Sequence, residues 1–307
     1  MSRVFVFVEH DDGLVTETSL QALAVASTIG DVEAVSVGDS GVGGWQIDHA
    51  VLTDYAPAAI AESLAQLVGA ELPSAVLAAG TERGNEIMAH LGALLDLPLA
   101  ANVTRVVPSG QDWKLTRVRW GGSLLEECTL TAFVKLATVA LHSIEAAPVQ
   151  TPSPVTVFTP DLTDVHAMTR VTERVTLTEG ITLTTAPVVV SGGRGVGSPE
   201  GFAVLEELAS LIGGAVGCSR VVTNSGWRPH SDQVGQTGTR VAPNLYIACG
   251  ISGAIQHWVG MMASKNVLAI NTDAEAPMVT KADYAVIGDL HPILDAIVAE
   301  VKRRQEA

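Results

Sequence analysis

Short apolar runs alternate with helical segments along most of this chain, and the alternation limits the folds it can adopt. In its first part the alternation involves apolar runs at residues 4–8, 32–37 and 74–79 and helix-like segments at residues 20–29, 58–68 and 82–95. Continuous apolar runs are typical of strands buried on both faces of a sheet. Strands that alternate with helices predict a parallel sheet covered on both sides, so the predicted fold class is α/β.

The length of the chain predicts two domains, because 307 residues are more than one core usually holds. Residues 112–139 are rich in β-branched side chains, and apolar and polar residues alternate along them. This pattern predicts extra, possibly antiparallel, strands that close the first domain. Residues 147–163 contain four prolines and are expected to form a loop-rich crossing. A second series of strands and helices begins with the buried-type strand PVVVS at Ala186. We therefore predict an N-terminal α/β domain over residues 1–185 and a doubly wound domain over residues 186–307.

Composition and charge narrow the possible partners. Hydrophobic residues make up 47% of the chain and charged residues 17%, which is typical of a globular protein. The net charge is −15, with most of the acidic excess in the first 185 residues, and this argues against nucleic acid or an anionic membrane as partner. A basic protein partner and a simply solvated acidic surface are both compatible with it.

The remaining global features predict a cytoplasmic protein without membrane insertion. No apolar run approaches the roughly 18 residues that span a bilayer, and the sequence MSRVFVFVEHDDG leads directly into a strand without a signal peptide. The three cysteines lack metal or disulfide spacing, so we expect buried thiols in a reducing compartment and no metal site.

The second domain opens with a glycine turn, SGGRGVGSPEG, that leads into a helix. Ser198 is expected to cap this helix, with Pro199 at its first position and Gly213 just past its end. The glycine spacing is not G-x-G-x-x-G, so a dinucleotide-binding interpretation from this turn alone is weak. Arg194, inside the turn, could reach a phosphate or a ring edge.

The stretch from Gln233 to Met262 carries the strongest functional signal. It predicts a polar glycine loop, a strand at residues 245–248, a turn of small residues at 250–253 and then a helix. A helix that opens after such a turn presents unpaired N–H groups and a positive dipole end, which suit a phosphate. Ser252 lies in the turn, and Gln256 and His257 follow one turn into the helix. These features predict a site for a large phosphorylated cofactor.

Four polar segments converge if the second domain is doubly wound, because the loops after successive strands share one edge of the sheet. Each residue also has an ordinary structural explanation. Arg220 could be a surface arginine, Gln236 and Thr237 turn formers, His257 a core histidine, Asn271 a turn residue and Asp289 a helix N-cap. Their joint occurrence at strand ends favours a site. The segments are residues 193–197, residues 219–220, residues 233–238 with 252–257, and residues 271–273 with Asp289.

The second domain resembles the flavin-binding domain of the electron-transfer flavoprotein α-subunit family, which includes the FixB-type proteins. The resemblance extends from about Val188 to Leu290. It rests on the series GGRG, CSR, QVGQTG, LYIACGISGAIQH, AINTDAEAP and ADYAVIGDL. The first domain is similar to the family's N-terminal α/β domain through VFVE and GTERGNEI. Residues 222–232, including Trp227 and Arg228, have no clear counterpart in the family pattern.

The resemblance implies FAD in an extended pose, with Arg220, Thr237 and His257 tuning the flavin. Arg220 over the isoalloxazine and a protonated His257 near the C2 carbonyl would favour anionic flavin, because fixed positive charge stabilises it. Thr237 would face N5, with Gln236 beside the same ring edge and Gln233 and Gly235 in the same loop. The other implied contacts are Arg194 and Ser219 at the flavin end, Ser252 and Gly253 at the pyrophosphate, Gln256 at ribityl or ring atoms, and Asn271 and Asp289 at the ribose and adenine.

As for function, the resemblance implies the α subunit of a heterodimeric electron carrier whose β subunit binds AMP. Such a carrier takes electrons from acyl-CoA dehydrogenases of fatty acid β-oxidation, or related dehydrogenases, and passes them to a membrane quinone-linked oxidoreductase. The alternative is a flavin- or NAD-dependent dehydrogenase with its own substrate, for which His257 is the only obvious candidate base. A third possibility is that FAD has only a structural role.

Overall fold

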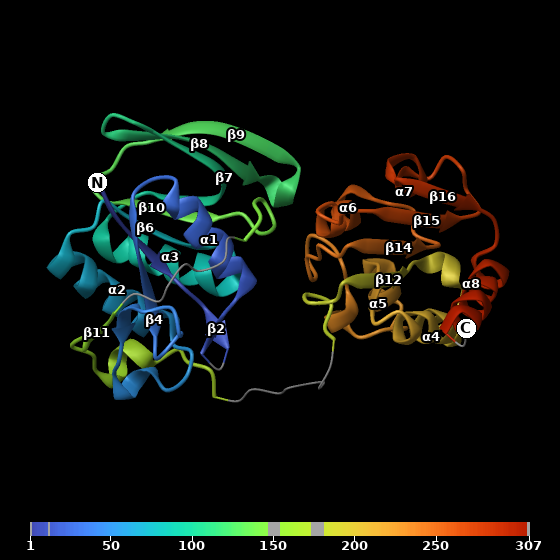
Figure 1. Cartoon of the computed structure of the whole chain (residues 1–307), viewed down its shortest axis with the longest axis horizontal. Coiled ribbons are helices and arrows are strands. Elements are labelled where there is room, and N and C mark those ends of the chain that lie inside the picture. Colours follow the sequence, from blue (N-terminus) through green and yellow to red (C-terminus); the bar gives the residue numbers. More distant parts are fainter. Residues whose placement is uncertain (1, 12, 147–153, 173–180, 306–307) are drawn as a thin grey trace. The chain divides into compact units, whose positions relative to one another are not determined.

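The computed structural model describes residues 2–11, 13–146, 154–172 and 181–305. The chain divides into two compact units, one built mainly from residues 1–175 and the other mainly from residues 176–307 (Figure 1). We call them unit 1 and unit 2. Both contain a largely parallel sheet with helices on its two faces, which confirms the predicted α/β class.

Unit 1 is built on a nine-stranded sheet with the order β11-β5-β4-β1-β6-β10-β7-β8-β9. From β11 to β7 each strand runs parallel to the next one in the sheet, as the alternation of strands and helices predicts. The strands are β1 (Arg3–Phe7), β4 (Asp31–Val37), β5 (Gly44–Ile47), β6 (Ala75–Ala79), β7 (Leu99–Ser109), β8 (Asp112–Arg119), β9 (Leu124–Leu130), β10 (Lys135–Val139) and β11 (Val155–Phe158). A short hairpin of β2 (His10–Asp11) and β3 (Leu14–Val15) follows β1.

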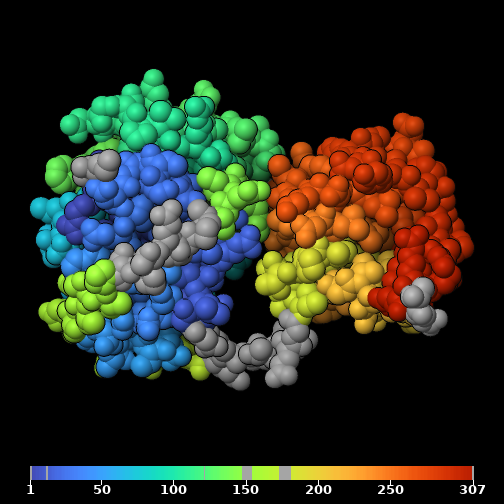
Figure 2. Space-filling view, viewed as in Figure 1, coloured from blue at the N-terminus to red at the C-terminus, as the bar shows by residue number. Residues whose placement is uncertain are grey.

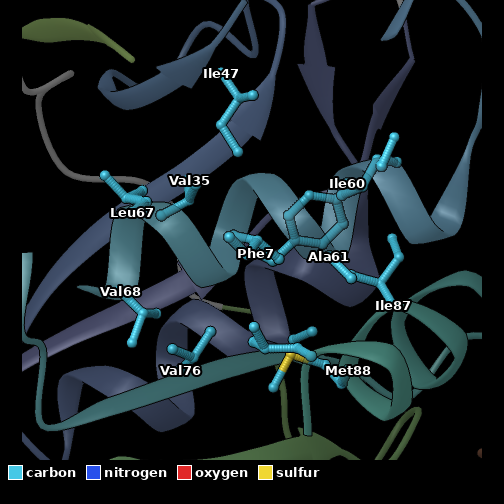
Figure 3. Packing of buried hydrophobic residues seen from close by; sticks show 14 of the residues in the cluster. Phe7, Val35, Ile47, Ile60, Ala61, Leu67, Val68, Val76, Ile87 and Met88 are labelled. Atoms are coloured by element: carbon cyan, nitrogen blue, oxygen red, sulfur yellow. The ribbon is translucent and has the colours of Figure 1, made fainter. Parts of the chain in front are cut away.

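Among the described residues, three α-helices cover this sheet: α1 (Glu17–Ser27), α2 (Pro57–Glu71) and α3 (Glu82–Leu95). Side chains of α2 and α3 pack on one face around Phe7 and Val76, as Figure 3 shows. Ala22 and Val25 of α1 pack on the other face. Local signals explain the helix ends: Pro57 is the first residue of α2, and the Thr81 side chain accepts the N–H of Gly84 at the start of α3.

The extra strands predicted at residues 112–139 are present, but they do not all lie at the edge of the sheet. β8 pairs antiparallel with both β7 and β9, and this edge forms the upper part of unit 1 in the view of Figure 2. β10, in contrast, lies parallel between β6 and β7 with all five residues buried. Leu136, Ala137 and Val139 are small or apolar, as fits a strand that is covered on both faces.

The expected loop at residues 147–163 also needs correction where it is described. Residues 147–153 lie outside the described part, but Val155–Phe158 form the edge strand β11, parallel to β5. Pro154 lies just before this strand, and its carbonyl accepts the N–H of Gly44. Proline is tolerated at the start of an edge strand because it lacks the backbone N–H donor but keeps its carbonyl acceptor.

Unit 2 has a five-stranded parallel sheet with the order β13-β12-β14-β15-β16. Numbered within the unit, this order is 2-1-3-4-5, a doubly wound arrangement whose strand order reverses between β12 and β14. Helices α4 and α8 cover one face around Leu205 and Leu294, and α6 and α7 cover the other through Met261 and Met278. The strands are β12 (Val188–Gly192), β13 (Ala215–Cys218), β14 (Leu245–Cys249), β15 (Val267–Asn271) and β16 (Tyr284–Ile287), and the helices are α4 (Ala203–Leu211), α5 (Arg220–Asn224), α6 (Ile255–Met261), α7 (Pro277–Lys281) and α8 (Leu290–Gln305).

The helix predicted after the first glycine turn begins later than expected. Residues 200–202 form a single 3₁₀ turn, and α4 follows from Ala203. Ser198 still caps this segment, because its hydroxyl accepts the N–H of Gly201 at 3.3 Å. Gly213 lies just past the helix with a φ of 64°, as its position predicts.

The cysteines match the prediction only in part, since Cys218 and Cys249 are buried but Cys128 is half-exposed. All three are free thiols. Among the helices in the described part of the chain, none is both long and apolar enough to cross a bilayer.

Candidate functional site

The turns that follow β12 and β14 meet where the strand order reverses. The N–H of Gly193 donates to the carbonyl of Cys249 at 2.8 Å, and the N–H of Gly195 donates to that of Gly250 at 3.1 Å. A Cβ on Gly193 would lie only 2.2 Å from the Gly250 oxygen, so the two backbones touch without room for a side chain. Position 193 therefore requires glycine, because two backbone segments of the chain approach each other closely there.

A cavity of about 520 Å³ lies beside these turns. Eight of the predicted site residues line it: Arg194, Ser219, Arg220, Ser252, Gly253, Gln256, His257 and Asn271. Doubly wound sheets bind ligands in the crevice at this reversal point, because the loops after neighbouring strands diverge there. Of the segments that the sequence predicts to converge, residues 193–197, 219–220, 252–257 and 271–273 contribute to this cavity, whereas residues 233–238 and Asp289 are not among those that line it.

Two free guanidinium groups give the cavity a positive character. Arg194 and Arg220 are exposed, and neither side chain makes an ion pair or hydrogen bond with a described residue. In contrast, Arg3, Arg117 and Arg228 all pair with carboxylates. Unpaired arginines that border one cavity suit an anionic ligand, since guanidinium binds phosphate in a bidentate manner.

His257 differs from its expected charge state. Its imidazole is 6% exposed, and Nε2 is 2.9 Å from the Tyr246 hydroxyl. Burial lowers the pKa of His257 to about 4, although the backbone carbonyl of Val234 favours a proton on the ring. The ring is therefore neutral near pH 7 in this structure, rather than the imidazolium that the resemblance implies.

The loop at residues 233–238 lies next to the cavity-forming helix, but its predicted site residues are not among those that line the cavity. The side chain of Gln233 is buried; its oxygen accepts the Thr223 hydroxyl at 2.8 Å, and its nitrogen donates to the Thr237 oxygen at 3.0 Å. The N–H of Gln236 donates to the Gln256 carbonyl at 2.7 Å. Gly235 packs against α6, where its Cβ would meet the Gln256 carbonyl at 3.0 Å. In this structure, Gln233 and Thr237 hold the shape of the loop.

Asn271 and Asp289 both have the local role that was the ordinary alternative. The amide of Asn271 donates to the Ile251 carbonyl at 3.0 Å, and its oxygen accepts the N–H of Asp273 at 3.1 Å. It thus shapes the turn while it lines the cavity. Asp289 precedes α8 and accepts the N–H of His291 at 3.0 Å, as an N-cap does, and it is not among the residues that line the cavity.

Sequence reasoning missed several residues of the site. Asn224 lines the cavity but lies outside every segment that the sequence predicts, and Ile251 and Asp273 line it from predicted segments without an assigned role. Tyr246 was treated only as part of an apolar strand, yet a tyrosine in a buried strand needs a partner for its hydroxyl, which is a usable signal. In the segment 222–232, Arg228 pairs with Glu206 and, at 2.8 Å, with Asp232, so this arginine fastens the loop to α4.

The described residues contain no group of three or more histidine, cysteine or acidic side chains that could hold a metal ion. The cavity is lined by the backbone of two glycine turns, by Arg194 and Arg220, and by His257, whose Nδ1 has no hydrogen-bond partner among the described residues. This donor set suits an organic anion with acceptor atoms along its length.

Comparison with known proteins agrees with these features. Residues 182–262 match the family model described as the electron transfer flavoprotein FAD-binding domain, and residues 4–165 match that of the electron transfer flavoprotein domain. The first matched segment contains most of the cavity-lining residues, from Arg194 to His257.

Full-length relatives give the same result. The electron transfer flavoprotein subunit alpha of Mycobacterium leprae (strain TN) is 36% identical, over 99% of this chain and 100% of the relative. Those of Syntrophomonas wolfei and Bacillus subtilis (strain 168) are 34% and 32% identical, with at least 98% of both chains covered. With its two-domain architecture, its doubly wound second domain and these matches along nearly its whole length, the chain belongs to the electron transfer flavoprotein α-subunit family.

Proposed function

We propose that this chain is the FAD-carrying subunit of a heterodimeric electron carrier. The observation that supports this proposal most is the cavity at the point in unit 2 where the strand order reverses. Arg194, Arg220 and His257 line it, and all three lie within the segment that matches an FAD-binding domain. A dinucleotide is long and anionic, so it suits a cavity that is lined by arginines and by the backbone of two glycine turns.

The residues that line the cavity fit this cofactor. His257 Nδ1 is buried without a hydrogen-bond partner in the described chain, and a ligand acceptor would satisfy it. A side chain on Gly253 would lie 2.3 Å from the Met278 nitrogen, so its turn exposes only backbone next to Ser252. When bound, FAD supplies the redox chemistry, and the protein supplies orientation and charge.

Within this proposal each end of the cavity has a task. Arg194 and Ser219 hold the flavin end, Arg220 places positive charge near the ring, and Ser252 with Gly253 receives the pyrophosphate. Gln256 and His257 contact ribityl or ring atoms, and Asn271 lies towards the adenosine part. Thr237 and Gln236 reach the ring edge only if the loop that carries them opens towards the ligand, since they do not line the cavity here.

The partners belong to the same proposal. The matched relatives are named as alpha subunits, which supports a β subunit, and that subunit is expected to carry AMP. We propose acyl-CoA or related dehydrogenases as electron donors and a membrane quinone-linked oxidoreductase as acceptor. The acidic net charge of −15 supports donors with basic docking surfaces, because opposite charges steer association.

The test is a reductive titration of the chain co-purified with its co-expressed partner. We expect bound FAD in the visible spectrum and reduction of that FAD by an acyl-CoA dehydrogenase with its substrate. Absence of flavin, even with excess FAD and the partner present, contradicts the cofactor assignment. Reduction of FAD by a small substrate without any donor protein points instead to a dehydrogenase.

A further inference from the structure

A buried hydrogen bond holds His257 from the side of the sheet. Tyr246 lies on β14 and is fully buried, while His257 lies on α6 and is 6% exposed. The Tyr246 hydroxyl oxygen is 2.9 Å from His257 Nε2, and the rings meet edge-on, with centroids 6.1 Å apart. Nε2 is thus held inside the protein, and His257 is also one of the residues that line the cavity.

The other nitrogen, Nδ1, is buried and has no hydrogen-bond partner of good geometry among the described residues. The backbone carbonyl of Val234 also faces the ring and favours a proton on it. A neutral imidazole carries one N–H donor and one acceptor nitrogen, so the partner of Nε2 decides what Nδ1 presents. Burial keeps this imidazole neutral near pH 7, since it lowers the pKa to about 4.

The direction of the Tyr246 hydrogen bond follows from the groups around the phenol. Burial raises the pKa of Tyr246, so the phenol keeps its proton. The Ser191 hydroxyl acts on the phenol as a hydrogen-bond donor, because it lowers the pKa of Tyr246, and it therefore leaves the phenol's own proton free for another acceptor. Nε2 is therefore the acceptor that the described residues offer the phenol, and a buried hydroxyl needs one.

We propose that Tyr246 is a positioning residue that fixes His257 as the neutral Nδ1–H tautomer, and so makes it a hydrogen-bond donor for a carbonyl-type acceptor in the cavity. The tautomer follows from this chain alone. Only the identity of the acceptor, a carbonyl of the flavin, rests on the proposed function.

The first experiment reads the tautomer without a ligand. Full-length protein labelled with ¹⁵N-histidine is freed of flavin, and the His257 nitrogens are assigned by loss of their signals in H257Q. We expect an N–H type shift at Nδ1 and an acceptor type shift at Nε2, with both nitrogens averaged between tautomers in Y246F. Y284F, which removes an exposed hydroxyl in the same unit, is the control and should leave the His257 signals unchanged.

A proton on Nε2 in the wild-type protein overturns the proposal, and so does an unchanged tautomer in Y246F. The wild-type spectrum decides the question even if Y246F does not fold.

The second experiment uses the protein loaded with FAD together with its partner. A donor to a ring carbonyl stabilises reduced flavin more than oxidised flavin, because that oxygen gains negative charge. We expect Y246F to lower the preference for reduced over oxidised FAD by roughly fivefold, the effect of one hydrogen bond, while Y284F leaves it unchanged. An unaltered preference in Y246F overturns the role towards the flavin. Failure of the wild-type protein to bind FAD refutes the proposed function, whereas the tautomer is tested independently by the ligand-free spectra.

Discussion

Gly260 of α6 packs directly on the backbone of Gly235, so that a Cβ added at Gly260 would lie 2.3 Å from the Gly235 nitrogen and Cα. This contact presses the loop of residues 233–238 against the helix that carries Gln256 and His257. The hydrogen bond from the Gln236 N–H to the Gln256 carbonyl fastens the same two segments. The loop proposed to reach the flavin edge is therefore positioned by the absence of a side chain on the neighbouring helix.

We expect Gly260→Ala to displace this loop and to destabilise the protein by about 1–3 kcal/mol, because backbone cannot yield as a flexible side chain does. FAD affinity should fall with it. Gly69→Ala in α2 is the matched control, since a Cβ there meets nothing within 4 Å and alanine favours a helix. Urea unfolding and FAD titration measure both variants, and equal stability of the two would contradict the proposed packing role of Gly260.

Arg194 is expected to contribute to FAD affinity through a charge-assisted hydrogen bond. Such bonds contribute about 1.5–3 kcal/mol, so Arg194→Ala should weaken FAD binding by about 10- to 150-fold. Arg304→Ala, which removes an exposed arginine paired with Glu300 on α8, should leave FAD affinity unchanged. Fluorescence titration of the flavin distinguishes the two. Equal affinities in both variants would exclude an ionic role for Arg194.

Arg220 is expected to act on the flavin potential rather than on binding. Its guanidinium has no ion pair in the described chain, so its full charge is available to the cavity. Removing one positive charge near the ring should lower the two-electron potential by about 20–40 mV, which corresponds to about 1–2 kcal/mol. Spectroelectrochemistry compares the potentials of Arg220→Ala, Arg220→Lys and the wild-type protein. The lysine variant keeps the positive charge, so its potential should stay closer to the wild-type value than that of the alanine variant. A potential that Arg220→Ala leaves unchanged rules out the tuning role.

The ligand-free protein should lose stability in mild acid because of His257. Burial lowers the pKa of this imidazole to about 4, whereas an unfolded histidine titrates near 6.5. The unfolded state therefore binds the proton first, and the free energy of unfolding falls as pH drops through the window from about 6.5 to about 4. Between pH 7 and pH 5 the expected loss is about 2 kcal/mol.

His257→Gln should remove this contribution. Urea unfolding at several pH values then gives a shallower pH dependence in the variant than in the wild-type protein. Parallel curves for the two would mean that the imidazole titrates normally in the folded state.

Local patterns predicted the helices and the buried strands well where one segment carries its own signals. The helix at residues 82–95 has the predicted bounds, because Thr81 caps it and its apolar residues repeat with helical spacing. The strand at Ala186 was recognised by its apolar run, and β12 follows at Val188–Gly192. The doubly wound order expected of unit 2 predicted the convergence of the cavity-lining turns. The family matches confirm the resemblance.

Non-local pairing explains the errors. β10 and β11 have sequences that also suit an edge or a loop, and only the order of the sheet assigns one to its centre and the other to its rim. Asp289 and Asn271 also depend on tertiary geometry: each accepts a nearby backbone N–H, and of the two Asn271 lines the cavity. Whether such a side chain bonds to nearby backbone or to a ligand depends on the three-dimensional positions of both, and the spacing of residues along the sequence does not give those positions.

The sequence by itself determined the α/β class, the doubly wound second domain and the family, because strand and helix periodicity, turn glycines and motif order are local properties of a chain. The tertiary structure alone decided that His257 is buried beside Tyr246, that it is neutral near pH 7, and that Gln233 and Thr237 bind each other beside the cavity. Charge state and exposure depend on which distant segments remove a side chain from water, and that is settled only when the sheet and its covering helices are assembled.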